Sequence, residues 1–236
     1  MKMKRIYFIA CLFLLPVCMQ AQEEKESKVS FDLGADLVSS YVWRGAYQTS
    51  AAIQPSMGLT VGGFSLSAWG SVPFSGTAKE VDFTLGYELG GLSVAITDYW
   101  WAGESAYKYF TYDAHKTAHH FEASLSYSLP VEKFPLSLSW NTMFAGEDYY
   151  KADGKRAYST YVSAGYPFRI KGVGLEAEIG LTPWEGMYAD GFAVVNIGLK
   201  ASKEIRITDG FSLPVFAQVL ANPEAEDIFL VFGLSF

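Results

Sequence analysis

Carboxylates are the residues of this chain best placed to do chemistry, because they recur on one face of segments that alternate between polar and apolar residues. They are Asp32, Asp36, Glu80, Asp82, Glu88, Glu122, Glu176, Glu178 and Asp227, and Lys200 is the clear base on the same face. Carboxylates that line a pore favour cations and repel anions. The alternative is a hydrated polar lining whose acids make local hydrogen bonds and select nothing.

Arg44 follows the first alternating segment and precedes Gly45. Two roles are open to it. It can be a gating or constriction charge at the mouth of a pore, or it can have a structural role, by anchoring the loop or by pairing with an acid on the inner face.

The histidines His115, His119 and His120 fall in one loop, near Asp113. This loop is the polar and aromatic stretch Ala102–His119, and His120 follows it directly. Nitrogen ligands at i and i+4 can hold a divalent metal if the stretch is helical, whereas an exposed loop that contains histidines needs no metal. A lipid-modifying enzyme needs a serine and a histidine within hydrogen-bond reach. His120 and Ser124 lie two pleats apart on a strand, which is too far for direct contact. We therefore expect neither a cofactor nor an enzyme.

Alternation with a period of two runs through residues 29–236 and predicts about twelve β-strands. The last stretch, Asp227–Phe236, places an unbroken apolar row at every second residue and requires a partner that covers it. Connections after the second, fourth, sixth and eighth strands are short, and those after the fifth, seventh and ninth are long. We also expect a loop at residues 44–50 and a longer connection at Ser202–Gly210.

Composition places these strands in a membrane. Aromatic residues make up 16% of the chain and charged residues 18%, and no run of 18 apolar residues follows the leader, so a membrane-crossing chain must form a closed barrel. The prediction is an all-β, antiparallel up-and-down barrel of the outer-membrane type over residues 29–236. A β-sandwich is the alternative, but the polar face has few lysines and the tryptophans gather near strand ends as in an interface girdle. The tryptophans are Trp43, Trp69, Trp100, Trp101, Trp140 and Trp184.

Residues 1–21 read as a cleaved signal peptide, with a basic start and a short apolar core, and residues 22–28 as a polar lead-in. A lipoprotein signal at Leu15–Cys18 fits less well. Cleavage leaves 15 basic and 25 acidic residues, a formal charge of −10, which argues against nucleic-acid binding.

Several segments resemble the TorF-type porin family of Gram-negative outer membranes. They are Ser39–Gly45 (SSYVWRG), Ala52–Ser56 (AIQPS), Ser67–Val72 (SAWGSV), Glu80–Tyr87 (EVDFTLGY) and Asp98–Trp100 (DYW), and the likeness covers roughly residues 36–101. The resemblance implies a small passive channel of undefined substrate, and Phe236 resembles the final-strand signal that the barrel assembly machinery reads.

The expected function is therefore passive diffusion of small neutral or cationic solutes through an outer membrane, with membrane lipid and the assembly machinery as partners. The internal width of a twelve-stranded barrel lies between that of eight-stranded barrels, which side chains fill, and that of sixteen-stranded porins, which are open. Trp69, Tyr161 and Phe229 are candidates for a constriction, and a plugged barrel with a structural or adhesion role is the alternative.

Overall fold

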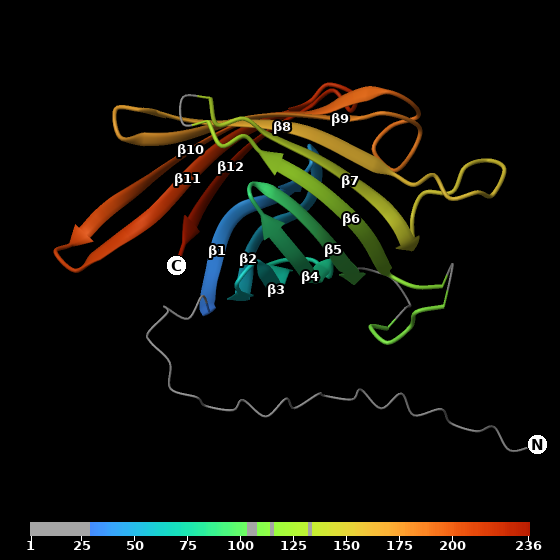
Figure 1. The fold of residues 1–236 in the computed structure, drawn as a ribbon, viewed down its shortest axis with the longest axis horizontal. Coiled ribbons are helices and arrows are strands. Elements are labelled where there is room, and N and C mark those ends of the chain that lie inside the picture. Colours follow the sequence, from blue (N-terminus) through green and yellow to red (C-terminus); the bar gives the residue numbers. More distant parts are fainter. Residues whose placement is uncertain (1–28, 103–107, 114–115, 132–133) are drawn as a thin grey trace, which may run out of the picture.

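The protein is a closed barrel of twelve antiparallel strands in up-and-down order (Figure 1). The computed structural model describes residues 29–102, 108–113, 116–131 and 134–236. The strands are β1 Val29–Trp43, β2 Ala46–Val61, β3 Phe64–Pro73, β4 Lys79–Leu89, β5 Leu92–Ala102, β6 His119–Ser128, β7 Ser137–Gly146, β8 Thr160–Ile170, β9 Val173–Thr182, β10 Ala193–Thr208, β11 Phe211–Asn222 and β12 Asp227–Ser235. The predicted fold class is confirmed; the expected signal peptide and lead-in lie outside the described residues.

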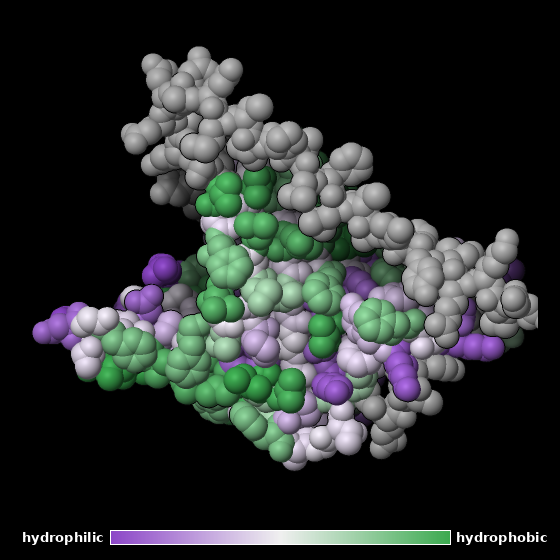
Figure 2. All heavy atoms as spheres, turned by 90° about the horizontal axis from the view of Figure 1, so that it is seen from below, coloured by the Kyte–Doolittle hydropathy of each residue, from purple (hydrophilic) through white to green (hydrophobic). Residues whose placement is uncertain are grey.

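The period of two separates an apolar outer face from a polar inner face. In β4, Phe83 and Leu85 are exposed outward, whereas Glu80 and Asp82 are buried inside. Exposed large apolar side chains recur on all twelve strands and give the outer surface its broad apolar areas (Figure 2). Such a surface is expected against lipid and is unusual in water. Within the described residues, no helix is long and apolar enough to span a membrane.

The two ends of the barrel differ, and we call them the turn end and the loop end. At the turn end, pairs such as Gly62–Gly63 and Gly90–Gly91 join neighbouring strands tightly. The expected longer connection at Ser202–Gly210 is wrong, because β10 continues to Thr208 and a two-residue turn follows. β10 and β11 consequently extend past the end of β12 (Figure 1).

β12 closes the sheet against β1, as its apolar row requires. The strand pairing covers only Asp36–Val38 of β1, opposite Gly233–Ser235. Two backbone hydrogen bonds between Ala35 and Phe236 extend the seam by one step, at 3.2 and 2.9 Å. Beyond Val38, toward the loop end, β1 no longer follows β12, and this departure creates the site described next.

Candidate functional site: a hairpin inside the barrel

The ends of β1 and β2 form a hairpin that leaves the barrel wall. Its residues Ser40–Ser50, which we call the inner hairpin, pair with each other, from Ser40 opposite Ser50 to Trp43 opposite Ala46. On one side the pairing with β12 ends at Val38, and on the other the pairing with β3 ends at Ala52. Both edges of the inner hairpin therefore lack strand partners within the described part of the chain. The expected loop at residues 44–50 is wrong, since only Arg44 and Gly45 form the turn.

The turn points across the barrel rather than out of it. Arg44 and Gly45 have φ angles of 51° and 80°, as a tight two-residue hairpin turn with two left-handed residues requires. A Cβ on Gly45 would lie 1.9 Å from the backbone oxygen of Val195 in β10. Asn222 of β11 donates a side-chain hydrogen bond to the Gly45 carbonyl at 3.2 Å. The tip thus rests against β10 and β11, in a place that only glycine fits.

Arg44 pairs with an acid on the opposite wall. Its two terminal nitrogens donate to the two carboxylate oxygens of Glu122 in β6 at 2.5 and 2.8 Å, and the side chains are only 11% and 1% exposed. One nitrogen also donates to the Tyr188 hydroxyl at 2.6 Å. A bidentate, buried pair of this kind is geometrically specific. The structural role foreseen for Arg44, pairing with an inner acid, is thus observed.

Aromatic rings surround the Arg44 guanidinium. Its carbon lies 4.3 Å from the ring centre of Trp43 and 4.7 Å from that of Tyr161, distances at which a cation and a ring attract each other. Burial raises the pKa of the Tyr188 hydroxyl to about 12, so this group is neutral at pH 7 beside the guanidinium. The neutral hydroxyl therefore adds a hydrogen-bond acceptor without a second negative charge.

The expected tryptophan girdle is only partly right, because three tryptophans lie inside. Trp43 contacts the rings of Tyr99, Trp101 and Tyr188, and Trp69 packs against Tyr41 of the inner hairpin. Trp140 and Trp184 contact each other on the outer side and are 43% and 37% exposed. Alternation does place Trp69 in β3 and Trp101 in β5 on the inner face. It cannot say which face of a bent hairpin points inward, so the position of Trp43 could not be read from the pattern.

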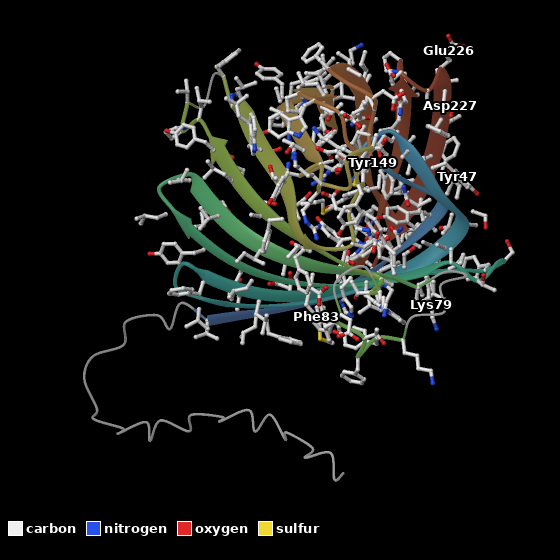
Figure 3. The ribbon with its side chains drawn as sticks, turned by 90° about the vertical axis from the view of Figure 1, so that its right-hand side faces the viewer. Tyr47, Lys79, Phe83, Tyr149, Glu226 and Asp227 are labelled. Carbon is white, nitrogen blue, oxygen red and sulfur yellow. The ribbon has the colours of Figure 1, made fainter. Side chains whose placement is uncertain are left out.

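The loop half of the barrel is filled. Side chains crowd this half and thin out toward the turn end (Figure 3), and Ala52, Met143 and Thr160 are fully buried there. All three constriction candidates take part in this packing. Trp69 contacts Tyr41, and the ring of Tyr161 lies against the Arg44 guanidinium. Phe229 of β12 stacks on Tyr47 of the inner hairpin, with ring centres 6.4 Å apart (Figure 3).

The inner-face carboxylates divide between the two halves. Toward the loop end, Glu80 and Asp82 are buried, Glu122 binds Arg44, and Glu178 accepts hydrogen bonds from Tyr161 and Asn196 at 2.6 and 3.0 Å. Toward the turn end, Asp32, Glu88 and Glu176 are exposed and Asp36 is half-buried. Asp227 is exposed at the loop-end rim (Figure 3). A continuous stripe of free carboxylates therefore does not form.

Lys200 is not the sole base inside. Arg169 and Lys200 line a hollow of about 470 Å³ at the turn end, together with Glu176, and Arg44 is buried in the loop half. Arg169 was missed because it stands one residue from the end of its strand, where alternation is weakest.

The histidines do not form a metal site in the described residues, and His115 lies outside them. The prediction that they share one loop is wrong, because β6 begins at His119 and sends His119 and His120 to opposite faces. His119 is buried on the outer side, with its ring nitrogens 2.7 Å from Asp98 and 2.6 Å from the Tyr109 carbonyl. His120 lies inside against Trp101, with ring centres 3.9 Å apart.

Tyr188, Val195 and Asn222 contact the hairpin tip, but the sequence alone did not identify them, because no motif or spacing around these residues indicates a contact with Arg44 or Gly45. One signal was available. An arginine and a glycine between two alternating segments match a two-residue turn, which would have placed Arg44 at the tip of a continuous hairpin.

No family model matches the chain, and no curated protein matches it.

Proposed function

We propose that this protein is a narrow, gated diffusion channel of a Gram-negative outer membrane, closed at rest by the inner hairpin. The observation that carries the proposal is the Arg44–Glu122 pair, which fastens the inner hairpin across the lumen. The edges of this hairpin pair with no strand among the residues that the structure describes. A hairpin without neighbouring strands is only marginally stable by itself. Its position accordingly depends on side-chain contacts with the barrel wall rather than on hydrogen bonds to neighbouring strands.

The membrane location is supported by the outer surface and by the closed sheet. The outward rows are large and apolar on every strand, and a closed barrel is one of two structures that satisfy all backbone groups in lipid. Strands of 9 to 16 residues suffice to cross a bilayer at the usual tilt. The resemblance of residues 36–101 to TorF-type porins agrees with this proposal.

Opening would connect the loop end with the turn-end hollow, whose charges then set selectivity. Among the described residues of the closed wall in that half, the acids Asp32, Asp36, Glu88 and Glu176 face the bases Arg169 and Lys200. We therefore expect open channels to prefer K⁺ to Cl⁻.

The test of function is the current through the refolded protein in a planar bilayer. We expect long closed intervals, brief conductance steps, and a reversal potential of cation sign in a KCl gradient. An anion-selective reversal potential would contradict the charge argument. Silence of the wild type and of every hairpin-weakened variant would remove the channel proposal.

A plugged barrel with a structural or adhesion role is the second candidate. The dense packing of the loop half favours it, because every one of the twelve strands contributes at least one buried side chain. The two candidates differ in whether weakening the tip contacts produces current.

A further inference from the structure

The outer face of the barrel carries an apolar groove of about 550 Å³ across the seam between β12 and β1. It lies on β9 to β12 and β1, which follow one another around the wall (Figure 1). Two alanines that face each other, Ala201 of β10 and Ala217 of β11, leave room beside the larger Phe232 and Leu37. An apolar hollow in a face that contacts lipid is suited to an acyl chain and not to water.

One charged side chain interrupts the apolar outer row at this groove. Lys203 lines the groove and stands on the outer face of β10 between Ala201 and Ile205, and Ile207 continues the row toward the turn end. Lys203 is exposed and forms no ion pair with any residue that the structure describes. Because a lysine on the lipid face of a barrel is destabilising, an anionic partner from the membrane would stabilise it there.

A second hollow, of about 460 Å³, adjoins the groove at the turn end. Ser202 and Lys203 line both spaces. The hollow also contains Arg169, Glu204 and the turn residue Gly172, and no aromatic or branched apolar side chain among the described residues lines it. Arg169, like Lys203, is exposed and has no ion-pair partner in the described part of the chain. With two bases against one acid, the hollow is suited to an anion.

We infer that the groove and the hollow together bind one anionic phospholipid of the membrane, with an acyl chain in the groove and the phosphate near Lys203 and Arg169. The short turns of bacterial outer-membrane barrels lie on the periplasmic side, so the lipid belongs to the periplasmic leaflet. A zwitterionic headgroup would bring a positive charge close to the two bases and bind less tightly. This inference rests on the membrane location proposed above, but it requires neither an open lumen nor a hairpin that moves.

The experiment is native mass spectrometry of the detergent-refolded barrel with dioleoylphosphatidylglycerol or with dioleoylphosphatidylcholine, which has the same acyl chains. We expect one tightly bound phosphatidylglycerol per barrel and at least about fivefold weaker binding of phosphatidylcholine, since a basic residue that meets an anionic lipid contributes about that factor. Lys203→Gln should weaken phosphatidylglycerol binding by about fivefold and leave phosphatidylcholine binding unchanged. Lys79→Gln, which removes an exposed lysine at the loop end, is the matched control and should change neither.

The groove is tested by filling it. Ala217→Phe places a ring in the groove and should weaken the binding of both lipids by about tenfold or more, because each methylene of the acyl chain that stays buried contributes about fourfold. Ala123→Phe adds the same ring to the exposed outer face of β6, away from the groove, and should leave both affinities unchanged. If Ala217→Phe does not show the gel shift of a folded barrel, Ala201→Phe replaces it, with the same expected loss.

Equal binding of the two lipids by the wild type, unaltered binding in Lys203→Gln, or unaltered binding in the groove-filling variant would each overturn the inference. A spectrum dominated by two chains that Ala217→Phe converts to one would assign the groove to a second copy of the protein and overturn it as well. Because the measurement involves no current, a silent barrel that prefers phosphatidylglycerol contradicts only the channel, and a conducting barrel without this preference contradicts only the lipid site.

Discussion

Replacing Arg44 by alanine should convert a mostly closed barrel into one that conducts steadily in a planar bilayer. The substitution removes both hydrogen bonds to Glu122 and leaves that carboxylate, which is 1% exposed, without its cation. Breaking a buried ion pair from one side typically costs about 3–5 kcal/mol. If that cost falls on the closed arrangement alone, the ratio of closed to open barrels drops by about 10²- to 10⁴-fold.

Arg169→Ala is the matched control for this experiment. It also removes an arginine from the interior, but at the exposed turn end and away from the inner hairpin. It should change ion selectivity slightly and leave the closed intervals as long as in the wild type. Glu122→Gln should open the barrel as Arg44→Ala does. Closed intervals as long as in the wild type in both Arg44→Ala and Glu122→Gln would show that the Arg44–Glu122 pair does not hold the hairpin.

Replacing Gly45 by alanine should displace the tip of the hairpin even though Arg44 and Glu122 remain. The new Cβ would lie 1.9 Å from the Val195 oxygen, a backbone atom that cannot rotate away. The φ angle of 80° adds strain for any residue with a side chain. Overpacking of this kind costs about 1–3 kcal/mol, and we expect longer and more frequent openings in single-channel records.

Gly62→Ala separates the clash from the backbone strain. Gly62 also has a left-handed φ, 62°, but a Cβ there meets nothing within 4 Å. Both variants bear the strain, and only Gly45→Ala meets the backbone of Val195 in β10. Both should therefore lose some resistance to heat, while Gly62→Ala keeps wild-type currents. Identical currents in the two variants would mean that the contact with Val195 does not hold the gate closed.

The barrel could be predicted from the sequence because its causes are local. Alternation with a period of two sets the faces of each strand, and glycine pairs such as Gly62–Gly63 mark the tight turns. The closing role of Asp227–Phe236 followed from its apolar row, which needs a neighbour. The position of Phe229 on the inner face, unexpected for so apolar a residue, is explained by its contact with Tyr47 of the inner hairpin.

The position of the inner hairpin could not be predicted because the contacts that hold it are distant in sequence. Arg44 and Glu122 are 78 residues apart, and Asn222 is 177 residues from Gly45. Alternation continues through the hairpin and gives no sign that its edges leave β3 and β12. The inner-face position of the carboxylates could be inferred, but their partners depend on which side chains the folded hairpin brings opposite them.

The most direct test of the gate is to remove it. Replacing Tyr41–Thr49 by Asn-Gly joins Ser40 to Ser50, which already face each other, through a favoured two-residue turn. Removal of the exposed turn residues Ala152–Gly154 serves as the control for shortening the chain at the loop end. The measurement is the single-channel current of the three proteins. Large, steady currents in the hairpin deletion alone are the predicted result, and a deletion variant as silent as the wild type, or a wild type that conducts as much as the deletion, would contradict a gate formed by the inner hairpin.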